Sequence, residues 1–168
     1  MSWLVRSSWG FILLACLALS ITAQSKANFS GTWLLDRSKS DIQQMRNMAD
    51  AQHAGLTMVV DQQGNTLHVT RTFKIEGEAR QEAHTYKTDG TETTNTGLRG
   101  ESVATKANWD GDQLVILSTR KVSMLVREVT VESKGIWRLS PDGKTLTIEG
   151  TIHAPRGEQR MRLVFDKQ

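Results

Sequence analysis

Short runs of alternating apolar and polar residues make up most of the chain after residue 54. The clearest run is 67–75, in which the two kinds of residue alternate over nine positions. A period of two is typical of a strand with one face in the core and the other in water. Comparable runs occupy 31–35, 56–60, 80–87, 102–109, 113–120, 126–139, 145–153 and 159–165. The pattern therefore predicts an all-β protein.

Glycine-containing turns separate consecutive runs. Asp89-Gly90 and Asp110-Gly111 are typical of tight hairpins, and Pro141-Asp142-Gly143 is another strong turn signal. With such short connections, we expect one domain over 24–168, an up-and-down antiparallel β-barrel of about nine or ten strands. Gly135 lies within the long run 126–139 and predicts a β-bulge there.

One segment departs from this pattern. Residues 40–53 contain a single β-branched residue, and Ile42, Met45, Met48 and Ala49 follow a helical spacing after a capping Ser40. We therefore expect one short helix after the first strand.

The first 23 residues have the layout of a secretory signal peptide. Arg6 supplies a positive charge, 9–23 carry no charge and include an apolar run, and the small residues Thr22-Ala23 follow. A membrane span needs about 20 consecutive apolar residues, and this run is shorter. The segment predicts removal after Ala23 and a secreted or periplasmic protein.

Cys16 allows a second interpretation of the same segment. Leu13-Leu14-Ala15-Cys16 resembles the cleavage box of bacterial lipoproteins, which would place a lipid anchor on Cys16. Leu14 is bulky for such a box and the apolar run continues past the cysteine. Removal of the whole segment is favoured, and it would leave a mature chain with no cysteine and no disulfide.

Charge and motifs exclude several classes of function. The pI is near 9.2 and the formal net charge is +3, but the basic residues are dispersed, which disfavours nucleic-acid binding. The histidines His53, His68, His84 and His153 lie in separate segments without metal-ligand spacing. No phosphate loop or nucleophile motif is present. We expect no cofactor, no metal and no catalytic constellation.

Hairpin register identifies the side chains that face inward. A two-residue turn at Glu76-Gly77 pairs Val69 with His84, Leu67 with Tyr86, Arg71 with Glu82 and Phe73 with Arg80. The apolar face of 67–75 must face the barrel interior. Arg71, Glu82, His84 and Tyr86 are then inside with it, either as a salt bridge of purely structural meaning or as a ligand-binding cluster.

The same reasoning places aromatic residues inside the barrel. Turns at Asp110-Gly111 and 141–144 point Trp109 and Trp137 inward, with Leu139 opposite Leu146. A turn at Arg156-Gly157 pairs Ile152 with Met161 and Ile148 with Phe165. Trp33, Trp109, Trp137 and Phe165 are expected in the barrel interior as core. Of these, Trp109, Trp137 and Phe165 are expected to line a ligand cavity with the polar cluster.

Several motifs resemble the calycin superfamily of lipocalins and fatty-acid-binding proteins. Residues 28–35 resemble its opening Gly-x-Trp strand, 106–111 its Lys-Trp-Asp-Gly turn and 164–167 its closing strand. Residues 29–33 with Asp36 and Lys39-Ser40 also resemble a group of exported bacterial proteins. The resemblance implies a barrel that holds a small apolar molecule.

Two positions test that resemblance. Fatty-acid-binding proteins hold the ligand carboxylate with an Arg two residues before a Tyr on the last strand. Here Leu163 stands at the Arg position and Phe165 at the Tyr position. Fatty acid is therefore not implied as the ligand. Calycins also pack a cation across the Gly-x-Trp tryptophan, and Arg160 or Arg162 are the candidates.

These observations lead to one principal hypothesis and two alternatives. The principal hypothesis is an exported protein that binds a small, mostly apolar molecule, oriented by Arg71, Glu82, His84 and Tyr86. One alternative is a solidly packed scaffold or interaction protein of the cell envelope. The other is a barrel enzyme that uses the polar cluster, although the spacing favours no particular reaction. The sequence does not predict an oligomeric state.

Overall fold

A computed structural model of the chain describes residues 26–41, 55–75, 78–124, 127–155 and 157–168. Within these residues the chain forms ten strands and no helix. The strands are β1 (Gly31–Leu35), β2 (Gly55–Gln63), β3 (Thr66–Ile75), β4 (Glu78–Lys87), β5 (Thr93–Thr96), β6 (Ser102–Asp110), β7 (Gln113–Met124), β8 (Arg127–Leu139), β9 (Thr145–Ala154) and β10 (Gly157–Lys167).

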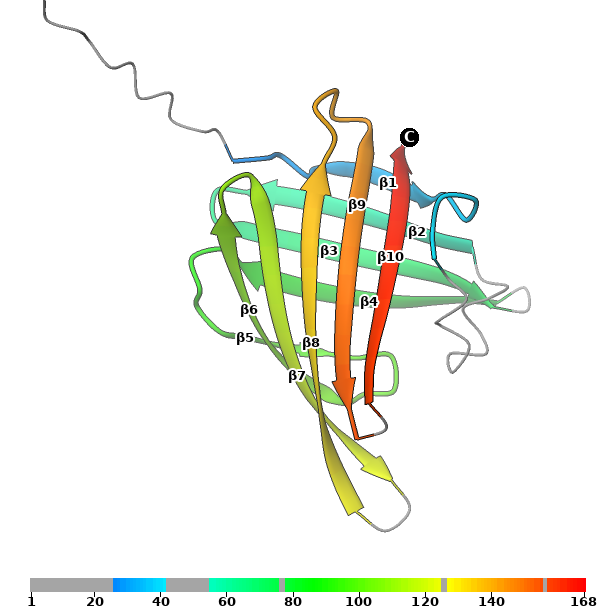
Figure 1. Cartoon of the computed structure of the whole chain (residues 1–168), viewed down its shortest axis with the longest axis vertical. Coiled ribbons are helices and arrows are strands. Elements are labelled where there is room, and N and C mark those ends of the chain that lie inside the picture. The colour runs from blue at the N-terminus through cyan, green and yellow to red at the C-terminus, as the bar shows by residue number, and fades with distance from the viewer. Residues whose placement is uncertain (1–25, 42–54, 76–77, 125–126, 156) are drawn as a thin grey trace, which may run out of the picture.

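The strands form one antiparallel sheet that curls into a nearly closed barrel. Their order is β4-β3-β2-β1-β10-β9-β8-β7-β6-β5, so neighbours along the chain pair with each other and the first strand pairs with the last. In Figure 1, β2, β3 and β4 cross behind β6 to β10 at a steep angle. The predicted all-β, up-and-down antiparallel barrel is confirmed.

The edge strands β4 and β5 are joined by side chains. The Asn95 amide donates to the carbonyl of Thr85 (3.1 Å) and accepts from the N–H of Thr85 (2.7 Å). The Thr93 hydroxyl donates to the same carbonyl at 2.8 Å. Asn95 thus supplies the donor and acceptor that a neighbouring backbone would offer, and it satisfies a strand edge that the sheet leaves open.

Most of the predicted helix lies outside the described residues. Ser40 and Asp41, its expected start, instead run along β10: the N–H of Val164 donates to the Ser40 hydroxyl at 2.8 Å, and the N–H of Asp41 donates to the carbonyl of Arg162 at 2.8 Å. The expected signal segment 1–23, with Cys16, also lies outside the described residues.

Several predictions of detail were wrong. Asp110 pairs with Gln113, so the turn is Gly111-Asp112 rather than Asp110-Gly111, and Trp109 still shares the face of Leu114. Gly135 forms no bulge, because pairing continues through it on both sides, to Ile116 of β7 and Gly150 of β9. The last hairpin pairs Ala154 with Gly157, so Phe165 lies opposite Leu146 rather than Ile148, and Leu163 lies opposite Ile148. The turn begins one residue earlier than expected, which shifts the pairing by two and leaves every inward face unchanged.

A lysine, rather than an arginine, covers the tryptophan of β1. The ammonium of Lys167 lies 5.2 Å from the centre of the Trp33 ring. Its side chain crosses Gly31, where a Cβ would come within 2.7 Å of it and where φ is +143°. The positive φ favours glycine at this position, whereas the flexible lysine side chain could move away from a Cβ. Arg160 and Arg162, the predicted candidates, bond instead to Glu158 and to the carbonyl of Lys39.

Candidate functional site

The two ends of the barrel differ in how tightly they are packed. At one end the inward-facing side chains are almost completely buried, including Phe29, Trp33, Leu114, Leu146 and Phe165. Toward the other end the inward-facing side chains become partly exposed. Along β3, Leu67 and Val69 are buried, whereas Arg71 and Phe73 retain exposed surface. The barrel therefore has a closed, packed end and an open end that solvent enters.

The polar cluster lies between these ends. The predicted pairs Val69–His84, Leu67–Tyr86, Arg71–Glu82 and Phe73–Arg80 are confirmed by the register of β3 and β4. Burial along β4 falls from Tyr86, 3% exposed, through His84, 8%, to the Glu82 side chain, 15%. The four side chains Arg71, Glu82, His84 and Tyr86 thus run from the packed end toward the opening.

Hydrogen bonds join these four side chains into one network. Both Nη atoms of Arg71 lie 3.3 Å from the Tyr86 hydroxyl, and Nδ1 of His84 lies 3.0 Å from it. On the other side of the ring, Nε2 of His84 lies 2.7 Å from Oε1 of Glu82 and 3.3 Å from the carbonyl of Thr96 on β5. The predicted Arg71–Glu82 ion pair is present at 3.8 Å, but His84 is the closer partner of Glu82.

The chemistry of the donors determines which atom donates and which accepts in each of these hydrogen bonds. Guanidinium N–H groups only donate, so the Tyr86 hydroxyl accepts from Arg71 and its own hydrogen points to Nδ1 of His84. Nδ1 then accepts, and the hydrogen of a neutral imidazole is on Nε2. There it faces two acceptors, the Glu82 carboxylate and the Thr96 carbonyl. Every bond has a matching donor and acceptor when His84 is neutral.

Electrostatics stabilise the charged forms of the two ionised members. Burial alone would lower the pKa of the Arg71 guanidinium, but Tyr86 and the charge of Glu82 leave that pKa above its usual value. Burial alone would raise the pKa of Glu82, but the hydrogen bond from His84 and the charges of Arg71 and Arg120 leave it below its usual value. The cluster therefore contains an ionised arginine and an ionised glutamate at neutral pH.

The predicted aromatic residues lie below the cluster, in the packed end. The ring of Trp137 contacts that of Tyr86, with centroids 6.4 Å apart. Trp109 stacks on Phe29 at 5.7 Å, and Trp137 meets the same phenyl ring edge-on at 5.6 Å. Phe165 is buried in this core. Trp109, Trp137 and Phe165 thus form the floor beneath the polar cluster, and Trp137 meets the ring of Tyr86 edge-on.

Four small residues line the barrel wall beside the cluster level. Ser118 of β7 pairs with Ser133 of β8, and Gly135 of β8 pairs with Gly150 of β9. All four share the inward-facing positions of Ile116, Trp137 and Ile148 on the same strands. Met161 lies over Gly150, where a Cβ would meet its Cε at 2.5 Å, whereas a Cβ at Gly135 would meet nothing closer than 3.8 Å. The inner face of the barrel therefore has space for a side chain at Gly135.

The roles of some other residues were not predicted. Phe29 precedes β1 and fills the packed end; the sequence places it in the motif 28–35 but does not indicate that it enters the core. Asn95 and Thr105 are buried polar residues that bond each other at 3.0 Å beside the β4–β5 edge. Thr105 lies in the predicted strand 102–109, but the segment of Asn95 reads as a polar loop, because β5 is the sequence Thr-Thr-Asn-Thr. The role of Asn95 is evident only when β4 and β5 are seen side by side.

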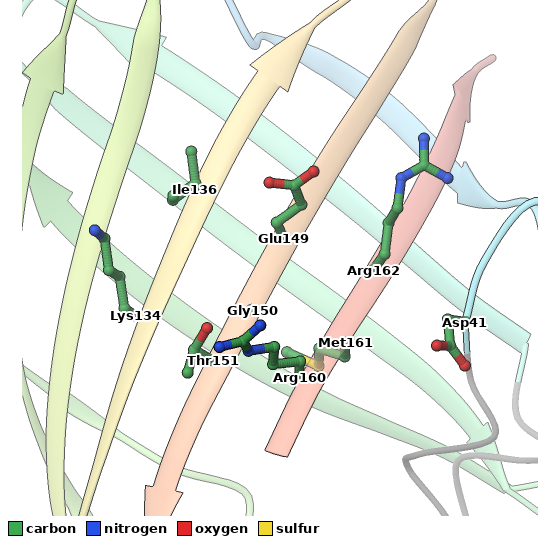
Figure 2. A pocket seen from close by; sticks show the side chains of 9 residues that line it. All are labelled: Asp41, Lys134, Ile136, Glu149, Gly150, Thr151, Arg160, Met161 and Arg162. Atoms are coloured by element: carbon green, nitrogen blue, oxygen red, sulfur yellow. The ribbon is translucent and has the colours of Figure 1, made fainter. Parts of the chain in front are cut away.

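A separate groove with a volume of about 370 Å³ lies on the outer face of β8, β9 and β10. Figure 2 shows Lys134, Glu149 and Arg162 on this face, with Asp41 at its border. Glu149 is paired with Arg138 and Arg160 with Glu158, so these charges already have partners. The groove is distinct from the interior cluster.

Metal-ligand clusters and membrane-spanning helices are both absent from the described residues. No group of three or more His, Cys, Asp or Glu side chains there is arranged to hold a metal ion. No helix in the same part of the chain is long and apolar enough to cross a membrane.

Comparisons with known proteins define the class of the fold. No family model matches the sequence, and a search of curated proteins finds no match. Solved structures do match. The zebrafish ileal bile acid-binding protein complexed with cholic acid is 15% identical, with a TM-score of 0.58, over 83% of this chain and 98% of that chain. A Drosophila melanogaster brain fatty acid-binding protein is 19% identical, with a TM-score of 0.54, over 83% and 99%.

A third structure, the REP1-NXSQ fatty acid transporter, is 14% identical with a TM-score of 0.57 and covers 83% of this chain and 95% of that chain. At these identities the likeness is one of fold. The chain shares the barrel fold of these proteins, which confirms the fold implied by the resemblance inferred from the sequence. The resemblance to exported bacterial proteins stays a prediction.

Proposed function

We propose that the protein binds one small, mostly apolar molecule inside the barrel, with the polar end of that molecule at Arg71, Glu82, His84 and Tyr86. The observation that carries the proposal is a hydrogen-bonded cluster of polar side chains on an apolar inner wall, at the level where the barrel opens to solvent. An apolar cavity with a few convergent polar groups is the usual form of a small-molecule site.

Two further observations support binding. The inner wall carries glycine or serine at four neighbouring positions, which leaves room where larger residues occupy the positions below. The proteins with the same fold include one crystallised with cholic acid and others named for fatty acids. Both favour an apolar ligand in the lumen over a barrel filled by its own side chains.

The arrangement disfavours His84 and Tyr86 as groups for acid–base catalysis. Both ring nitrogens of His84 already have partners, and the Tyr86 hydroxyl is bonded on both sides. A general base needs a free lone pair within reach of the substrate. The structure leaves none on His84 in its neutral form.

The test is to load the protein with lipids and fill the lumen by mutation. Purified protein is incubated with a mixture of fatty acids, fatty alcohols and sterols, desalted, and the bound lipids are extracted and quantified by mass spectrometry. We expect about one lipid per wild-type chain. Gly135→Val should lose it, because the added methyl groups extend into the lumen from a position with nothing within 3.8 Å of the Cβ.

Lys134→Val is the matched control, because it places the same side chain on the outer face of the same strand. It should retain the bound lipid. A wild-type barrel that retains no lipid from the mixture would overturn the proposal and favour the packed scaffold. Equal retention by Gly135→Val and wild type would place the ligand outside the lumen.

We also propose that the chain is exported and that residues 1–23 are removed, on the strength of the charge and apolar pattern of that segment. Mass spectrometry of the protein purified from the envelope of a bacterial host tests this. A mature chain that begins at Gln24 is expected. A chain that begins at Cys16 and carries diacylglycerol would replace this proposal with lipid anchoring.

A further inference from the structure

The charges around the cluster are balanced. Arg71 is paired with Glu82, and Arg120, which faces the same interior from β7, is paired with Glu101 at 3.7 Å. Arg80 shares the inward register but is exposed at the opening, where water screens its charge. Leu163 and Phe165 on β10 add no charge. A ligand head group at this level therefore meets one acid and one base that already neutralise each other.

The cluster nevertheless has unused hydrogen-bonding capacity. Arg71 donates to Tyr86, but a guanidinium has further N–H groups that bond to no acceptor among the described residues. Glu82 uses Oε1 for both His84 and Arg71, and its Oε2 has no protein partner in the same part of the chain. The two side chains are 20% and 15% exposed, so both reach solvent at this level of the barrel.

We infer that the preferred ligand is an apolar alcohol rather than a carboxylic acid. This inference rests on the proposed function and specifies its ligand class. A hydroxyl group is uncharged, and it can accept from the Arg71 guanidinium while it donates to the Glu82 carboxylate. A carboxylate could accept from Arg71, but it has no hydrogen for Glu82 and is repelled by it. The site discriminates by the match of donor and acceptor and by the charge of Glu82.

A competition among three ligands with the same alkyl chain tests this. Wild-type protein is incubated at neutral pH with equal amounts of hexadecanol, palmitate and hexadecyl methyl ether, and the lipids retained after desalting are quantified. We expect hexadecanol to bind at least about tenfold more tightly than palmitate, the size of one hydrogen bond to a charged group. The ether should bind more weakly than the alcohol, because it cannot donate to Glu82.

Glu82→Gln tests the cause of the preference. The amide keeps an oxygen acceptor but removes the negative charge, so Arg71 becomes free to attract palmitate. We expect the alcohol-to-palmitate ratio to fall by about tenfold. Glu92→Gln is the control, because it removes the same charge from an exposed residue paired with Lys106 and should leave the ratio unchanged.

Each result decides a different claim. Palmitate binding that equals or exceeds hexadecanol binding would overturn the alcohol inference and leave lumen binding intact. If the protein retains none of the three ligands and no lipid from the earlier mixture, the proposed function itself is overturned. A ratio that does not change in Glu82→Gln would show that this carboxylate does not set the preference, and the wild-type competition remains decisive if that variant fails to fold.

Discussion

Glu82 is an ionised carboxylate on the inner wall, with His84 2.7 Å and Arg71 3.8 Å away. Burial opposes its charge, but its partners hold its pKa below the usual value of 4.5. An acid whose pKa is lower in the folded state stabilises the fold above the unfolded pKa. That contribution is lost as pH falls through the lower, folded value.

We therefore predict that Glu82→Gln reduces the pH dependence of stability. Denaturant unfolding monitored from neutral pH to about pH 3 should show a smaller loss of stability in the variant than in wild type. Glu92→Gln, at an exposed pair, should keep the wild-type slope. A variant curve parallel to wild type over the acid range would contradict the lowered pKa of Glu82.

The paired glycines Gly135 and Gly150 differ in the space beside them. A Cβ at Gly135 would make ordinary contacts, the nearest at 3.8 Å to Nε1 of Trp137. A Cβ at Gly150 would lie 2.5 Å from Cε of Met161, so that flexible side chain would have to move. Glycine within a strand also costs conformational entropy relative to alanine.

Gly135→Ala should therefore stabilise the protein by about 0.5–1 kcal/mol, whereas Gly150→Ala should gain less or lose stability. The free energy of unfolding in urea checks both. Destabilisation by Gly135→Ala would show that this position needs glycine for its backbone.

Single residues also mark the limits of prediction from sequence. The inward positions of Arg71, Glu82, His84 and Tyr86 followed from one turn and the strict alternation of strand side chains, because the period of two depends only on local geometry. The bond from His84 to Thr96 and the position of Lys167 over Trp33 depend on which distant strands meet. The alternation of residues along one hairpin does not predict which distant strands contact each other.

Among the elements, β4 and β5 are the two ends of the sheet, and no strand pairing joins them in the described residues. Their link at Thr85 is made by the side chains of Asn95 and Thr93. Asn95→Ala would leave the N–H of Thr85 without that acceptor. We predict a loss of about 1–3 kcal/mol and faster amide exchange at Thr85.

Thr94→Ala is the matched control, because Thr94 is exposed and lies next to Asn95 on the opposite face of β5. It should change stability little. Protection of the Thr85 amide that is equal in wild type and Asn95→Ala would show that the amide side chain does not bridge this edge.

The strands show why faces were predicted better than partners. The β9–β10 pairing differs from the expected one by two residues, yet Leu163 and Phe165 still face inward, since a shift of two restores the same face. Strand β5 was missed because it has no apolar alternation: its inward side chain, Asn95, bonds to a strand edge instead of entering an apolar core.

On the scale of the whole molecule, the barrel combines a solid end with an open one. The packed end is completed by a residue from outside the meander: Phe29 is fully buried against Trp109 and Trp137, and its carbonyl accepts from the indole N–H of Trp33 at 2.9 Å. Its own N–H donates to the side chain of Gln62 at 2.9 Å. The segment before β1 therefore joins strands from both halves of the sheet.

Phe29→Ala should therefore destabilise the entire fold, by about 3–5 kcal/mol, because a buried aromatic ring is removed from a packed end with no neighbour free to replace it. Phe73→Ala is the matched control: it removes the same ring from a partly exposed position at the open end, and it should cost clearly less. Chemical unfolding followed by tryptophan fluorescence measures both, and the stacking partner Trp109 should report the loss of Phe29 in the native spectrum. Equal costs for the two variants would mean that both ends are packed alike. The open end would then offer no room for a ligand.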